Sequence, residues 1–127
     1  MTRTFAAALW VAATMVAAPA WAQGNEARGE RLFNQQCKAC HTVEKGGPST
    51  VGPNLQGLFG RKAGSVPDFD YSDAMKNSGI VWTEVTLDQF LQGPRKMVPG
   101  TKMTFVGIPK PQDRADLIAY LEAATKP

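Results

Sequence analysis

Residues 37–41 read Cys-Lys-Ala-Cys-His, and the side chains of this stretch indicate a functional site around which the rest of the chain folds. Its two cysteines are three positions apart, so on a helical turn their thiols project from neighbouring positions of one face. The imidazole of His41 follows at once, and it is the single histidine of the chain. Two thiols and one imidazole are therefore expected within about one turn of backbone.

The spacing of these three side chains is typical of c-type haem attachment, in which the thiols bond to porphyrin vinyl groups and the imidazole binds iron. A structural zinc site needs four ligands and usually a second Cys or His pair, which is missing here. A thioredoxin-like redox pair belongs beside a βαβ pattern, and a disulfide would close a very short loop with little entropic gain. We favour haem attachment over these three alternatives.

The N-terminus carries a separate signal. Arg3 supplies a positive charge, residues 5–18 carry none, and residues 20–22 (Ala-Trp-Ala) present the small residues that a signal peptidase reads. The apolar run is shorter than the ~20 residues needed to span a bilayer. We predict a cleaved bacterial secretory signal over residues 1–22 and a soluble periplasmic protein of residues 23–127.

Composition and charge limit the class of protein to which residues 23–127 can belong. The chain of 127 residues is 43% hydrophobic and 20% charged, which fits one globular domain and excludes a disordered tail or a collagen-like repeat. Its formal charge of +3 falls to +2 when Arg3 leaves with the signal. Such a slight excess argues against a nucleic-acid partner.

Capping residues and apolar spacing predict helices joined by loops. The expected helices run from Asn25 to about Gln36, from Ser72 to near Gly79, from Thr83 to Gly93-Pro94, and from about Gln112 to Thr125, with a short turn at Met97. The expected buried residues are Leu32 and Phe33 in the first helix, Val85, Leu87, Phe90 and Leu91 in the third, and Leu117, Ile118, Tyr120 and Leu121 in the last. Gly, Pro, Ser and Thr crowd residues 46–70, which we expect to be loop.

A second axial ligand would decide what a bound haem does, because a Met/His pair favours electron transfer. The secreted part offers Met75, Met97 and Met103. Met103 lies in a segment stiffened by Pro99 and turned by Gly100, which favours it as a ligand carried across the cofactor. Each methionine could instead fill a gap in the core, so all three stay open at this point.

Four stretches of the sequence resemble the class I c-type cytochromes, the family of mitochondrial cytochrome c and its short soluble bacterial relatives. They are CKACHTVEKGG (37–47), GPNLQGLFGRKAG (52–64), PGTKMTFVGI (99–108) and DLIAYL (116–121). The resemblance extends over nearly all of residues 23–127. It implies an all-α, single-domain class I cytochrome c fold, with helices and Gly/Pro-rich loops wrapped around one covalent haem.

The resemblance also implies roles for single residues. Cys37 and Cys40 match the thioether cysteines, His41 the proximal iron ligand, and Met103 the distal one. Pro53 matches the proline whose carbonyl accepts the other ring N–H of that histidine. Around the haem propionates the matching residues are Arg61, Tyr71, Trp82 and Thr101, with Phe105 over the exposed haem edge. At the crossing of the first and last helices they are Gly29, Phe33, Leu117 and Tyr120.

Two positions depart from the usual pattern of the mitochondrial members. Phe90 stands where a tyrosine is common, and Met75 stands where an asparagine commonly helps to hold an internal water. Both changes remove polar groups near the haem. We therefore predict a drier distal pocket.

In function, the resemblance implies a monomeric one-electron carrier and not an enzyme. Its implied donor is a quinol-oxidising cytochrome complex, and its implied acceptor is a terminal oxidase or a photosynthetic reaction centre. Basic residues expected at the docking surface are Lys38, Lys45, Arg95, Lys96, Lys102 and Lys110. The alternatives are a ligand-binding haem protein with an open sixth position and a dedicated subunit of a periplasmic dehydrogenase.

Overall fold

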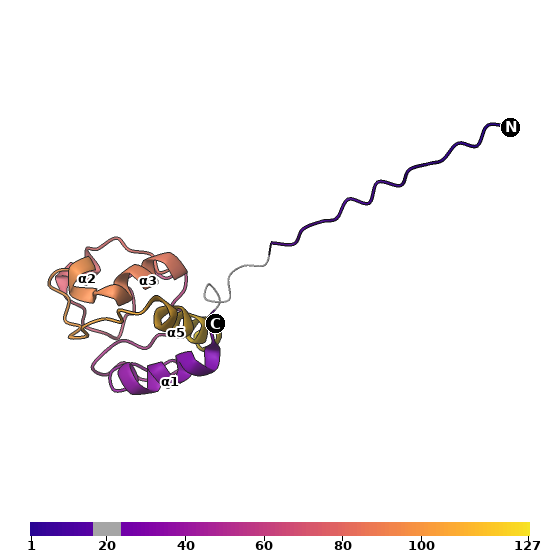
Figure 1. Cartoon of the computed structure of the whole chain (residues 1–127). Helices are drawn as coiled ribbons and strands as arrows, with labels where there is room; N and C mark the ends of the chain where they lie inside the picture. Colours follow the sequence, from indigo (N-terminus) through magenta and orange to yellow (C-terminus); the bar gives the residue numbers. More distant parts are fainter. Residues whose placement is uncertain (17–23) are drawn as a thin grey trace.

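The computed structural model describes residues 1–16 and 24–127 (Figure 1). Its helices are α1 (Glu26–Gln36), α2 (Asp73–Lys76), α3 (Glu84–Gln92), α4 (Pro94–Met97) and α5 (Pro111–Ala124). Within these described ranges the extended structure is limited to one isolated antiparallel bridge between Lys62 and Val81. The long segments between helices are loops, so the all-α expectation is confirmed.

Three helices begin at the capping residues that the sequence indicates. The side chains of Asn25 and Ser72 each accept a hydrogen bond from the backbone N–H three residues further on. Thr83 and Thr86 form a reciprocal capping box, with N–H···Oγ1 distances of 2.8 and 3.1 Å. These bonds satisfy N–H groups that have no partner inside a helix. Local sequence therefore accounts for where α1, α2 and α3 start.

One predicted core residue is wrong. Val85 is 67% exposed, although Leu87, Phe90 and Leu91 of the same helix are buried. Residues two positions apart do not share a helix face, so Val85 points away from the side that Leu87 buries. Tyr120 and Leu32 are half-buried.

Some helix boundaries also differ from the prediction. Helix α2 ends at Lys76, and the N–H of Asn77 closes its last turn on the carbonyl of Asp73. Helix α4 starts as a separate element at Pro94, where the absence of an N–H is tolerated. Helix α5 likewise starts on a proline, Pro111, one residue before the predicted start.

Helices α1 and α5 cross in close contact, and Figure 1 shows α1 directly below α5. A Cβ on Gly29 would lie 1.9 Å from the backbone oxygen of Asp116, so no side chain fits there. The rings of Phe33 and Tyr120 are 5.4 Å apart at this crossing, and Leu117 is 1% exposed. The predicted crossing is confirmed, and it sets the direction in which α1 delivers Cys37.

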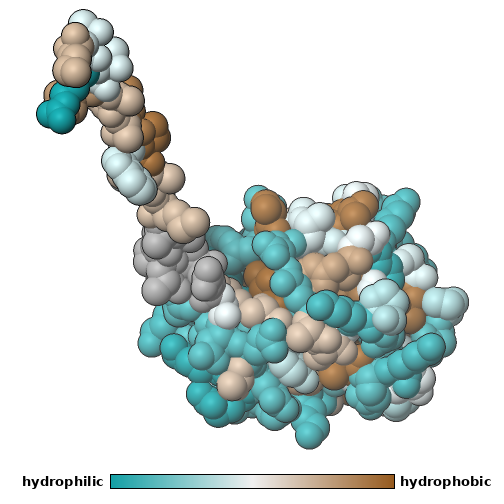
Figure 2. Space-filling model, turned by 90° about the vertical axis from the view of Figure 1, so that its right-hand side faces the viewer, coloured by the Kyte–Doolittle hydropathy of each residue, from teal (hydrophilic) through white to brown (hydrophobic). Residues whose placement is uncertain are grey.

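The N-terminal residues 1–16 are exposed and contain no helix, and Figure 2 shows hydrophobic side chains of this segment uncovered. The predicted cleavage point after Ala22 lies outside the described residues. In the described part of the chain, none of the helices has the length and apolar character that crossing a membrane requires.

Candidate functional site

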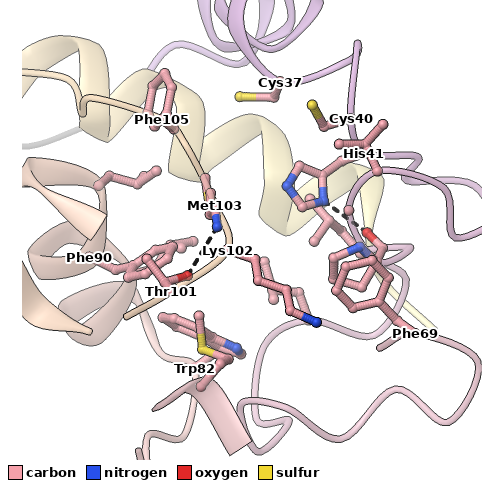
Figure 3. Close-up of a pocket in the computed structure, with 18 of the residues that line it drawn as sticks. Cys37, Cys40, His41, Phe69, Trp82, Phe90, Thr101, Lys102, Met103 and Phe105 are labelled. Atoms are coloured by element: carbon pink, nitrogen blue, oxygen red, sulfur yellow. Dashed lines mark hydrogen bonds between the residues drawn. The ribbon is translucent and has the colours of Figure 1, made fainter. Parts of the chain in front are cut away.

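A cavity of about 320 Å³ opens between the end of α1 and the loop that follows α4. Its lining includes every residue that the sequence predicts for the site: Cys37, Cys40, His41, Pro53, Arg61, Tyr71, Trp82, Thr101, Met103 and Phe105. Figure 3 shows Cys37 and Cys40 along one edge of this cavity, with the ring of His41 beneath them. The fold thus gathers side chains from segments that are far apart in the sequence.

The two thiols and the imidazole are positioned by the end of α1. The N–H of Cys37 donates to the carbonyl of Phe33 at 2.8 Å, which extends the helical turn into the motif. The N–H of His41 then donates to the carbonyl of Cys37 at 2.9 Å. The two cysteines are not joined to each other in a disulfide. One tight turn therefore presents all three groups to the cavity.

The imidazole of His41 is held in one orientation. Its Nδ1 donates to the carbonyl of Pro53 at 2.8 Å, because a carbonyl can only accept, and Nε2 is left with a free lone pair. Burial lowers the pKa of His41, and the bond to Pro53 opposes this only in part. The ring is therefore neutral near pH 7, which is the form that binds iron.

Gly52 is a residue of the site whose role the sequence analysis did not identify. A Cβ at this position would lie 2.5 Å from Cε1 of His41, so a side chain would displace the ring. Before a proline, Gly52 reads only as part of a turn. The contact between Gly52 and the His41 ring forms only when the loop folds, so no local sequence pattern predicts it.

Two observations argue against a thioredoxin-like redox pair and against a structural zinc site at this motif. Burial, followed by the effect of Cys40, raises the pKa of the Cys37 thiol to about 11. A thioredoxin-like nucleophile needs a lowered thiol pKa instead. Across residues 1–16 and 24–127, no group of three or more His, Cys, Asp and Glu side chains is arranged to hold a metal ion. Neither a thiol redox centre nor a structural zinc site is supported.

The lining of the cavity distinguishes between the three methionines that could supply a sulfur ligand. Met75 and Met103 line it, whereas Met97 on α4 is not part of the lining. The N–H of Met103 donates to Oγ1 of Thr101 at 3.2 Å, as Figure 3 shows. In that view the segment that carries Met103 passes on the opposite side of the pocket from His41. The geometry therefore leaves two of the three methionines as candidates.

The predicted propionate neighbours are held at the cavity wall largely by backbone groups. The guanidinium of Arg61 donates to the carbonyls of Gln56 and Asn54 at 2.7 and 3.3 Å, and burial lowers its pKa. The Tyr71 hydroxyl accepts from the N–H of Val66 at 3.3 Å, and burial raises its pKa. These contacts fix where two polar side chains meet the cavity.

Aromatic and aliphatic side chains form most of the remaining wall. Trp82 packs edge-on against Phe90 with ring centres 5.0 Å apart, and both are buried. Phe69, which the sequence analysis did not single out, also lines the cavity and packs edge-on against Tyr71 at 4.9 Å. A flat apolar cofactor fits such walls, and the two thiols, imidazole and thioether match the donors of a covalent haem.

All six basic residues predicted for docking are exposed. One of them, Lys102, is not free: its Nζ lies 3.1 Å from a carboxylate oxygen of Asp70. The sequence analysis did not foresee this ion pair, because its partners come from different loops.

Comparisons with known proteins give a consistent result. The sequence profile of the family described as "Cytochrome c" matches residues 26–125. The chain is 53% identical to cytochrome c of Sesamum indicum over 102 residues, which are 80% of this chain and 92% of that protein. It is 54% identical to cytochrome c2 of Rhodomicrobium vannielii over 110 residues, 87% of each chain. It is also 54% identical to cytochrome c of Theileria annulata over 103 residues, 81% of this chain and 89% of the other.

Proposed function

Because this chain belongs to the cytochrome c family, we propose that it carries single electrons from a quinol-oxidising cytochrome complex to a terminal oxidase or photosynthetic reaction centre. Family membership makes it an electron-transfer protein with covalent haem c, not an enzyme. The observation that carries the proposal is one cavity lined by both thiols, by His41 and by Met103.

Each residue of the motif has a distinct task in this proposal. The bound haem supplies an iron that takes up and releases one electron. Cys37 and Cys40 would tether it through thioethers, and Nε2 of His41 would donate its lone pair to the iron. The bond from His41 to Pro53 keeps the ring oriented and its lone pair available. Met103 would supply the sulfur donor to the iron, from the loop on the side of the cavity opposite His41.

The cavity walls set the redox preference. Leu58, Leu87 and Leu91 are each no more than 5% exposed and line the cavity, so they exclude water from it. An apolar setting penalises the more charged ferric state, and a thioether ligand acts in the same direction. Residues 3 and 5–22 support export to a bacterial periplasm, where a carrier of this kind would meet its membrane partners.

The proposal is tested with membranes from the organism that makes the protein. Purified protein should be reduced by these membranes on addition of quinol and then reoxidised by their terminal acceptor, followed by the visible absorption of the haem. The rates should fall as salt rises, because charges placed near the haem edge steer the encounter. A protein that the membranes neither reduce nor oxidise would contradict the proposal.

A pair of charge reversals tests the docking surface. Lys96→Glu should slow both reactions and flatten their salt dependence. Lys76→Glu is the matched control, because Lys76 is also exposed and lies outside the six predicted docking residues. Equal rates for the two variants would remove Lys96 from the docking surface.

A further inference from the structure

Residues 68–70, Asp-Phe-Asp, are tied at both ends to other loops, and we call them the strap. At one end, Oδ1 of Asp68 accepts a hydrogen bond from Oγ of Ser49 at 3.2 Å. At the other end, the ammonium of Lys102 donates to the carboxylate of Asp70 at 3.1 Å and to its carbonyl at 3.2 Å. The two aspartates thus make unlike bonds to two different loops.

The two ties lead to opposite sides of the cavity. Ser49 also accepts the N–H of Asn54 at 3.0 Å, and Asn54 directly follows Pro53, the partner of His41. The first tie therefore reaches the loop that orients the imidazole. Lys102 directly precedes Met103, so the second tie reaches the loop that carries the thioether.

Phe69 stands between the two ties, and its ring lines the cavity. It packs edge-on against Tyr71, whose hydroxyl is in turn held by the N–H of Val66. Figure 3 shows Phe69 and Lys102 on the same side of the pocket. The strap therefore places an aromatic ring at the cavity while connecting the two loops.

We propose that the strap is a positioning device that holds the loop of His41 and the loop of Met103 together and keeps Phe69 at the cavity. The inference rests on the axial ligands of the proposed function. Each tie alone is weak, since Asp70 and Lys102 are 88% and 55% exposed and exposed ion pairs contribute little. Because both ties restrain the same three residues, losing both frees the strap, whereas losing one leaves it attached.

The test follows the replacement of the sulfur ligand by imidazole in the purified ferric holoprotein. Imidazole can bind the iron only while Met103 is detached, so its binding rate reports how firmly the loop is held. The double variant Asp68→Ala/Lys102→Ala, which removes the bond to Ser49 and both bonds of the Lys102 ammonium, should bind imidazole about tenfold faster, and either single variant no more than about threefold faster. Asp68→Asn should match the unchanged protein, because its amide oxygen still accepts from Ser49.

Glu30→Ala is the control, since it removes an exposed carboxylate of α1 outside the cavity lining. Amide hydrogen exchange of residues 65–71 gives a second readout, which should be faster in the double variant and unchanged in the control. An unchanged imidazole rate in the double variant would overturn the proposal. If the unchanged protein lacks the long-wavelength absorption band of sulfur-ligated ferric haem, the ligand assignment fails first, and the two failures are thereby distinguished.

Discussion

The two sides of the cavity are built in different ways. On one side, His41 follows Cys40 directly, its N–H is bonded to the carbonyl of Cys37 and its ring to Pro53. On the other side, Met103 lies in a loop without helix, where its N–H is bonded to the side chain of Thr101. The imidazole is positioned by backbone within one turn, whereas the thioether depends on a loop.

As a consequence, the Met103 loop is held less strongly than the turn that carries His41. The neighbour of Met103, Lys102, is tied to Asp70 over 32 positions of sequence by an exposed ion pair. Such contacts open more readily than a turn that grows out of a helix. Ligand exchange at the iron is therefore expected on the Met103 side and not on the His41 side.

The largest effect is expected from His41→Ala. Without the imidazole, the tethered iron loses the ligand next to its attachment point, so the yield of haem-bearing protein should fall by more than about tenfold. Haem staining of denatured protein measures this yield. A normal yield with an unchanged spectrum would show that the histidine side is not the anchor.

Met103→Ala should separate the two sides. The tether and His41 remain, so covalent haem protein should still accumulate, but the sulfur–iron(III) band should disappear and the ferrous form should bind carbon monoxide. Met97→Ala is the matched control, because Met97 does not line the cavity. Retention of the band in Met103→Ala would point to Met75, the other sulfur in the lining.

Gly29→Ala should destabilise the packing of α1 against α5, which positions the turn that carries His41. The new Cβ would meet the backbone oxygen of Asp116 at 1.9 Å, so α1 and α5 must separate. We expect a loss of about 2–3 kcal/mol of unfolding free energy, measured by denaturant titration of the holoprotein. Gly46→Ala is the control: it has φ +77° but open space, and should cost only about 1 kcal/mol. Equal losses would mean that the helix crossing tolerates a side chain.

The smallest effect is expected from a pair of carboxyl groups remote from both ligands. A hydrogen bond to Glu84 and partial burial raise the pKa of Glu122 to about 7. Because the folded-state pKa is the higher one, this stabilisation is full below about 4.5, the ordinary pKa of the group, and is lost as pH rises through about 7. Thermal unfolding from pH 5 to 8 should therefore show a slightly decreasing stability.

Glu122→Gln should flatten that pH dependence without changing the haem spectrum. Glu30→Gln, on the exposed face of α1, should leave the dependence as it is. A spectrum that changed in Glu122→Gln would mean that this corner of α3 and α5 is coupled to the ligands after all.

Much of the site follows from local patterns. The spacing of Cys37, Cys40 and His41 predicts their convergence, and Asn25 and Thr83 predict where α1 and α3 begin. The error at Val85 also has a local cause, because Val85 and Leu87 are about 200° apart around a helix and cannot belong to one apolar stripe. The ligand role of Met103 and the drier distal pocket around Phe90 remain predictions.

The sequence by itself determined the covalent chemistry, the helix starts and, by resemblance, the family. A turn of helix has nearly the same geometry wherever it occurs, so spacing alone is sufficient for those features. Only the tertiary structure decided that Gly52 lies against the His41 ring, and that Asp70 is paired with Lys102. Loops have no periodicity to read, and their side chains meet partners that long-range packing brings to them.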